Sequence, residues 1–215
     1  MWANAAAILG AMLGFGVIHS LTAGLKLKQG LTGIFGERPI QGLYRFAYNA
    51  FSVLTILPAL VLVLVLPNET VYAVGLPWSV LLTALQVTGL VGLVISVLSI
   101  DLLRFVGLSQ IVALVDDKPL PLPEEDLQTN GVYRLVRHPL YFFSLLLIWA
   151  VPVMTVNWLV FCLGSTAYFV FGSLIEERRM LNAFGDRYAR YMKQVPWMLP
   201  WPRPKQVESK TTLDS

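Results

Sequence analysis

Two short polar motifs in this 215-residue chain, Arg137–Tyr141 (RHPLY) and Glu176–Arg178 (EER), have residue types that could do chemistry together. Cations on one motif and carboxylates on the other suit a zwitterionic ligand such as an amino-acid group. Arg137 or His138 would take the carboxylate of such a ligand, and Glu176 or Glu177 its ammonium. We therefore predict a polar binding site wherever the fold brings the two motifs together.

The alternative interpretation is that these charges only anchor an apolar segment. No Asp, Glu, Lys or Arg occurs from Leu140 to Ile175. Basic residues beside a membrane span often do no more than set its orientation. The elements around the two motifs must decide between anchoring and a site.

Composition indicates an integral membrane protein. Hydrophobic residues make up 56% of the chain and charged residues 13%, with a mean hydropathy of +0.64. Ordinary soluble domains carry about 25% charged residues. One cysteine is too few for a disulfide or a cysteine metal site within one chain. We expect no metal site and no nucleic-acid binding.

The apolar stretches predict an all-α fold with five transmembrane helices, because one span needs about 20 apolar residues. The stretch from 140 to 175 would reach about 54 Å as one helix, which exceeds a hydrocarbon core of about 30 Å. Pro152 provides a break, so we predict a hairpin of two spans there. The five expected spans are 3–25, 46–66, 76–100, 140–151 and 157–175.

Positive charge predicts the orientation of these spans. All 16 lysines and arginines fall in segments 26–45, 101–139 and 176–215, which a five-span chain places on one side. Cytoplasmic loops carry the excess of such charges. We expect the N-terminus outside, the C-terminus in the cytoplasm and, for so compact a chain, a bacterial inner membrane.

The segments between the spans carry further expectations. Segment 26–45 is rich in glycine and is expected to be an irregular connection. Asp101 and Arg104 are expected to pair on one helical face. After the last span, apolar and aromatic residues recur at helical spacing and predict an amphipathic cytoplasmic helix over 176–195. We predict one membrane domain over 1–205, with a disordered tail at 206–215.

The two motifs belong to a longer ordered pattern. It begins with GVYRLVRHPLY at Gly131–Tyr141 and continues with Glu176–Arg178, Phe184-Gly185, Tyr188, Tyr191 and Val195-Pro196. This pattern resembles the C-terminal signature of the isoprenylcysteine carboxyl methyltransferase superfamily. That superfamily includes phospholipid N-methyltransferases and methanethiol S-methyltransferases, and Trp149, Pro152, Met154 and Thr155 look most like the methanethiol branch.

The resemblance implies an S-adenosylmethionine-dependent methyltransferase with its cofactor at the cytoplasmic membrane face. Arg137, His138 and Glu177 would be the catalytic residues. The cofactor pocket would comprise Arg137, His138, Pro139, Tyr141, Glu176, Glu177, Tyr188 and Tyr191. The acceptor would be a small or lipophilic thiol or carboxylate, which could enter from the membrane lipids.

One residue departs from the family pattern. Phe143 stands two residues after the motif tyrosine, where family members usually carry glycine. The larger side chain predicts a change in the shape of the pocket.

Two rival functions remain open in the sequence. His19 lies inside the first expected span, where an ionisable residue is a functional hypothesis by default. His19 and His138 could be the axial ligands of a haem in a membrane isomerase or oxidoreductase. Alternatively, the chain is a non-catalytic membrane scaffold that keeps the motifs for topology alone.

Overall fold

The computed structural model describes residues 2–123 and 125–201, and most of them are helical. Among these residues, four helices are long and apolar enough to cross a membrane. They are α1 (Trp2–Thr22), α3 (Glu37–Val65), α4 (Trp78–Leu98) and α8 (Val156–Phe184). The prediction of a helical integral membrane protein is confirmed at this level.

The expected fourth span, 140–151, is a shorter helix in the structure. Helix α7 covers Pro139–Trp149, about 16 Å at 1.5 Å per residue, so it does not reach across a core of about 30 Å. Proline suits the first helical position, where its missing N–H costs no hydrogen bond. The chain leaves the helix just before Pro152, and strand β2 (Val153–Thr155) follows. The fifth crossing therefore stays a proposal.

A two-stranded ladder closes the hairpin end of the bundle, which the all-α prediction missed. Strand β1 (Thr70–Ala73) pairs with β2 in antiparallel register, with Tyr72 opposite Met154. Asn157, 1% exposed, donates from Nδ2 to the carbonyl of Leu66 at 3.1 Å. The side chain of Thr155 caps the start of α8 by accepting from the Trp158 N–H.

The end of the bundle opposite the β1–β2 ladder carries the short elements, and one of them forms where a loop is expected. Segment 26–45 is not irregular, because α2 (Leu25–Phe35) and the start of α3 fill it around Gly36. Helices α5 (Leu102–Val106) and α6 (Leu108–Val115) and the 3₁₀ turn η1 (Gly131–Arg134) follow α4.

Asp101 and Arg104 do not form the expected side-chain pair. The Asp101 carboxylate caps α5 by accepting from the backbone N–H of Arg104 at 3.0 Å. The Arg104 guanidinium instead pairs with Glu125 at 2.8 Å. Helix capping satisfies a backbone donor that would otherwise have no partner, which favours this use of the carboxylate.

The predicted helix over 176–195 is divided in two. Helix α8 continues to Phe184, and α9 covers Asp186–Gln194. Between them, Gly185 has φ +52° and ψ −128°, a backbone conformation that glycine adopts without steric cost. The expected tail at 206–215 lies outside the described residues.

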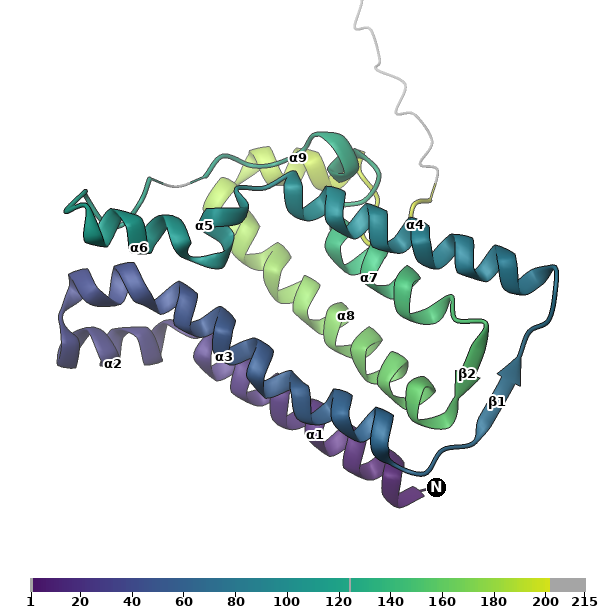
Figure 1. Cartoon of the computed structure of the whole chain (residues 1–215). Helices are drawn as coiled ribbons and strands as arrows, with labels where there is room; N and C mark the ends of the chain where they lie inside the picture. The colour runs from purple at the N-terminus through teal and green to yellow at the C-terminus, as the bar shows by residue number, and fades with distance from the viewer. Residues whose placement is uncertain (1, 124, 202–215) are drawn as a thin grey trace, which may run out of the picture.

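The bundle consists of two packed helix pairs with α8 beside them (Figure 1). Helix α1 packs along α3, α4 packs along α7, and α8 contacts α1, α3 and α7. The N-terminal end of α1 lies near the β1–β2 ladder, where Asn4 donates to the Pro67 carbonyl at 2.7 Å. Helices α2, α5, α6 and α9 lie at the other end, so the basic segments among the described residues gather there.

The contact between α4 and α7 explains how the large side chain of Phe143 is accommodated. Buried residues of α4 on this face are small: Gly89, Gly92 and Ser96. A β-carbon on Gly92 would overlap the Phe143 ring, and one on Gly89 would lie 2.8 Å from the Leu147 nitrogen. Small residues let helix backbones approach closely in membranes. Phe143, 7% exposed, therefore packs into α4.

We predict that Gly92→Ala destabilises the protein by about 1–3 kcal/mol, because the added methyl forces the Phe143 ring to move. Combining Gly92→Ala with Phe143→Leu should recover part of the loss. Gly14→Ala on α1 is the control, since its β-carbon would meet nothing within 4 Å. Unfolding in detergent measures the effect, and equal stabilities for Gly92→Ala and Gly14→Ala would contradict this packing.

Candidate functional site

The two polar motifs come together where α7 begins and α8 nears its end. Arg137 and His138 precede α7, and both are buried, with 9% and 4% of their surface exposed. Tyr141 lies in the first turn of α7, and Glu176 and Glu177 lie in the last third of α8. We call these five residues the polar cluster.

The buried centre of the polar cluster is an ion pair between Arg137 and Glu177. The Arg137 Nε and Nη2 atoms both lie 2.7 Å from Glu177 Oε1. The Arg137 Nη1 atom donates to the carbonyls of Met192 and Val195 at 3.1 and 2.8 Å. These carbonyls lie at the C-terminal end of α9, so one guanidinium joins the start of α7 to both α8 and α9.

Backbone hydrogen bonds strengthen the same junction. The Arg137 N–H donates to the Pro196 carbonyl at 2.9 Å and to the Trp197 carbonyl at 3.0 Å. The His138 N–H also approaches the Trp197 carbonyl, at 3.3 Å. The segment after α9 therefore lies directly against the first motif, which motif spacing could not reveal.

The two glutamates have different surroundings. The Glu177 side chain is 11% exposed and faces Arg137, whereas that of Glu176 is 46% exposed. Glu176 Oε2 accepts a hydrogen bond from the Tyr141 hydroxyl at 2.7 Å. The His138 ring lies between them, with Nε2 3.3 Å from Glu177 and Nδ1 3.7 Å from Glu176. Glu176 is thus the carboxylate with room for a ligand.

Aromatic rings continue the site along α7 and α8. The Tyr141 ring stacks on His138 at 5.4 Å between centroids and on Phe169 of α8 at 5.0 Å. Phe169 was not predicted, although its place two helical turns before Glu176 is a signal that could have found it. These flat faces could hold a ring of a ligand.

Tyr188 and Tyr191 lie on α9, the helix whose terminal carbonyls accept hydrogen bonds from Arg137. They are 2% and 6% exposed and form an apolar cluster with Val195, packed by Leu127, Met180, Phe184 and Met192. The Tyr191 hydroxyl donates to the Tyr133 carbonyl at 2.6 Å. Burial raises the pKa of Tyr188 to about 12, so this hydroxyl stays protonated at neutral pH.

Pro139 begins α7 and is fully buried. It offers the site no backbone hydrogen-bond donor, because proline carries no N–H. Its rigid φ sets the angle at which α7 leaves Arg137 and His138.

The histidines do not favour the haem hypothesis. The His138 ring nitrogens face the two glutamates. His19 is engaged on α3: its Nδ1 lies 3.1 Å from the Ser52 hydroxyl and its Nε2 lies 2.5 Å from that of Tyr48. An axial ligand needs a nitrogen directed at the iron, whereas all four ring nitrogens face protein side chains here.

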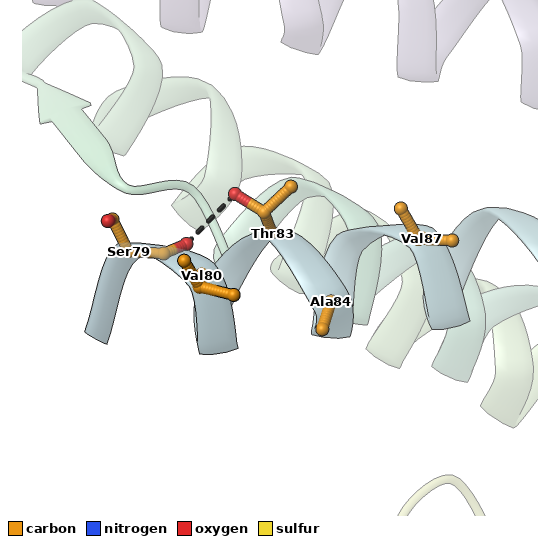
Figure 2. Close-up of a pocket in the computed structure, with 5 residues that line it drawn as sticks. All are labelled: Ser79, Val80, Thr83, Ala84 and Val87. Carbon is orange, nitrogen blue, oxygen red and sulfur yellow. Dashed lines mark hydrogen bonds between the residues drawn. The ribbon is translucent and has the colours of Figure 1, made fainter. Parts of the chain in front are cut away.

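A hollow of about 470 Å³ lies elsewhere, on α4 (Figure 2). It is lined by Ser79, Val80, Thr83, Ala84 and Val87. The Thr83 hydroxyl donates to the Ser79 carbonyl of the same helix at 2.9 Å. No lining residue is titratable, and α4 starts at the end where the β1–β2 ladder lies, so we assign no chemistry to this hollow.

We predict that Arg137→Ala lowers the free energy of unfolding by about 3–5 kcal/mol, because it leaves the Glu177 carboxylate buried without its partner. Arg187→Ala is the control. Arg187 pairs with Asp126 at 2.8 Å on the surface, where its removal should leave stability unchanged. Detergent unfolding compares the two variants, and equal losses would show that the buried pair does not hold the helices together.

The amino-acid sequence is similar to those of known proteins. Residues 87–187 match the family described as phospholipid methyltransferase. Methanethiol S-methyltransferase 1 of Bradyrhizobium diazoefficiens is 32% identical over 189 residues, which cover 88% of this chain and 64% of that protein. The methanethiol S-methyltransferase of Mycobacterium tuberculosis is 40% identical over 82 residues, 38% of this chain and 34% of that protein.

A protein-S-isoprenylcysteine O-methyltransferase of Schizosaccharomyces pombe is 37% identical over 81 residues, 34% of this chain and 33% of that protein. The matches cover less than two thirds of the length of each of these three relatives. No solved structure matches the chain significantly. The polar motifs Arg137–Tyr141 and Glu176-Glu177 both lie within residues 87–187, the part of the chain that matches the phospholipid methyltransferase family, and the chain as a whole is similar to methanethiol S-methyltransferases.

Proposed function

We propose that the protein transfers a methyl group from S-adenosylmethionine to a small thiol at the cytoplasmic face of the membrane. The observation that carries the proposal is the polar cluster, which joins a buried Arg137–Glu177 pair to a half-exposed Glu176 inside the family domain. The relatives named as methanethiol S-methyltransferases favour a thiol over a carboxylate as the acceptor.

The residues present fit this cofactor. S-adenosylmethionine carries an ammonium, ribose hydroxyls and an adenine ring. Glu176 offers an accessible carboxylate, and the Tyr141 and Phe169 rings offer flat faces. The indole Nε1 of Trp197 is buried without a hydrogen-bond partner. A buried donor without a partner costs free energy, so an acceptor on the cofactor would stabilise this position.

Each residue of the polar cluster would have its own role in binding the cofactor or positioning the site. Glu176 would bind the ammonium or the ribose hydroxyls, held in place by the Tyr141 hydroxyl. His138 lies between the two carboxylates and would fix their separation. Arg137 and Glu177 would position the site, because they join the ends of α7, α8 and α9. Tyr188 and Tyr191 would support that frame.

The cofactor would supply a methyl group already activated on a sulfonium, so the protein's task is to align donor and acceptor and to exclude water. Alignment of this kind contributes roughly 7–11 kcal/mol to lowering a barrier. The buried Arg137–Glu177 pair keeps that alignment rigid.

We further propose that the end of the bundle with α2, α6 and α9 faces the cytoplasm of a bacterial inner membrane, with the N-terminus outside. The support is that the basic segments among the described residues gather at this end. In this arrangement α7 and the residues after it make the fifth crossing. The soluble cofactor then reaches the polar cluster from the cytoplasm.

We predict that Glu176→Gln weakens S-adenosylmethionine binding by about 10- to 100-fold, because a hydrogen bond to a charged group contributes about 1.5–3 kcal/mol. Tyr141→Phe should weaken binding less, since the carboxylate remains but loses its orienting hydroxyl. Asp116→Asn, at a surface pair with Lys118, is the control. Calorimetry in detergent measures the affinities. A wild-type protein that binds no cofactor would favour the scaffold hypothesis, and equal binding by wild type and both variants would place the pocket elsewhere.

The acceptor class is tested by product analysis. We expect membranes that contain the protein, given methyl-labelled S-adenosylmethionine, to convert ethanethiol to its methyl thioether. N-acetyl-S-farnesylcysteine should give little or no base-labile methyl ester. The reverse preference would assign the protein a carboxylate acceptor.

A further inference from the structure

A second polar group lies between α1 and α3, outside the polar cluster. His19 of α1 contacts two hydroxyls of α3, those of Tyr48 and Ser52. All three residues are half-buried. The Phe15 and Tyr168 rings lie 5.3 and 6.0 Å from the His19 ring. We call His19, Tyr48 and Ser52 the His19 triad.

The hydrogen bonds of the His19 triad determine where the protons lie. The Ser52 hydroxyl donates to the Tyr48 carbonyl at 2.8 Å, which uses its one hydrogen. Its oxygen must then accept from His19, so Nδ1 carries the ring proton. Nε2 is left with a lone pair. The Tyr48 oxygen lies 2.5 Å from Nε2 and 3.3 Å from Nδ1, so Nε2 is the nearer ring nitrogen and the one to which we assign the Tyr48 proton.

This arrangement prepares His19 to act as a general base. Ser52 fixes the tautomer, His19 Nε2 is the proton acceptor, and the Tyr48 hydroxyl lies between Nε2 and whatever binds on its other side. In activated acid–base pairs generally, a third group orients a histidine toward a hydroxyl, and Ser52 takes the place of that group here.

A continuous series of ring contacts joins the His19 triad to the polar cluster. From His138 it runs through Tyr141, Phe169 and Tyr168 to His19. The four centroid distances along it are 5.4, 5.0, 6.0 and 6.0 Å. Tyr48 also interacts electrostatically with Tyr141 and Arg179. The two groups therefore lie on neighbouring faces of α8, near the end that we assign to the cytoplasm.

We propose that the His19 triad binds and deprotonates the thiol acceptor, an inference that rests on the function proposed above. A thiol has a pKa of about 8.5 or higher and is mostly protonated at neutral pH, whereas the thiolate is the nucleophile. A carboxylate acceptor would need no base, because it is already ionised. The His19 triad thus has a role with a thiol that it would not have with a carboxylate.

The proton transfer balances as follows. The S–H bond breaks, its electron pair stays on sulfur, and its proton passes to the Tyr48 oxygen as the Tyr48 proton passes to His19 Nε2. The sulfur pair then forms the bond to the methyl carbon, while the pair of the methyl–sulfonium bond stays on the donor, which leaves as a neutral thioether. The His19 imidazolium returns its proton to solvent.

Titratable and charged groups lie on each helix that packs near His19, and those in direct contact with its ring are Tyr48 and Tyr168. Helix α3 contributes Tyr44 and Tyr48, α8 contributes Tyr168 and Arg179, and α2 carries Lys26 and Lys28. The apolar surroundings favour a neutral imidazole, which is the form that accepts a proton.

The kinetic test uses His19→Gln and Tyr48→Phe, with Thr55→Val as the control. The Thr55 hydroxyl bonds only carbonyls of its own helix, at Phe51 and Ser52. For ethanethiol at neutral pH, we expect His19→Gln to lower kcat/KM by on the order of 100-fold. The deficit should shrink as pH approaches the thiol pKa, where solvent supplies the thiolate. S-adenosylmethionine affinity should not change.

A second readout does not depend on turnover. The chain has two histidines, so isotope-labelled histidine gives two sets of NMR signals, and His19→Gln assigns them. We expect His19 to show the Nδ1–H tautomer. Ethanethiol should shift the His19 signals in wild type and leave them unshifted in Tyr48→Phe.

The outcomes separate this inference from the function on which it rests. Wild-type protein that binds the cofactor and methylates ethanethiol, but whose His19→Gln variant keeps the wild-type pH profile, would overturn the inference alone. A deficit equal at all pH values, or His19 signals indifferent to ethanethiol, would reduce His19 to a packing role. Wild-type protein that binds no cofactor would overturn both proposals.

Discussion

The buried ion pair between Arg137 and Glu177 is the interaction on which the rest of the site depends. Removing two charges from water is costly, and their attraction repays that cost only when the remaining donors and acceptors are also satisfied. Here the Arg137 Nη1 atom bonds two carbonyls at the end of α9, so the desolvated charge also fixes a helix end. This junction orients Glu176 and Tyr141, because they extend from the same helices that the pair joins.

The sequence predicted the elements whose signal is local. Four long apolar helices, the break near Pro152 and the meeting of the two polar motifs follow from composition, proline chemistry and charge placement. The errors come from contacts between separate segments, which the sequence of one segment alone does not reveal. Segment 26–45 contains glycines that suggest a loop, yet α2 forms there and packs against α3. The short α7 and the β1–β2 ladder depend on pairing across about 80 residues of chain, which no local pattern reveals.

The same limit applies within the site. Adjacent glutamates on a helix point about 100° apart, so different surroundings for Glu176 and Glu177 were to be expected. Which of them is buried is decided by Arg137, and Arg137 is directed by carbonyls of α9 that carry no side-chain signature. Phe143 is a similar case: the family pattern made it a departure within the pocket, whereas its ring fills space that Gly92 leaves open on α4. A departure in one motif is thus accommodated by a residue about 50 positions away.

In the proposed reaction, a methyl donor and a thiol acceptor place opposite demands on one protein. The donor is charged and water-soluble, so its site needs carboxylates near the membrane surface, and the polar cluster lies where the basic segments gather. A small thiol partitions into apolar surroundings, where a charged base would be costly. A neutral histidine whose tautomer is fixed by a serine hydroxyl meets that demand, because it becomes charged only when a proton arrives. The rings of Tyr141, Phe169 and Tyr168 are in contact with one another, and through them the carboxylate site and the neutral base are joined along α8.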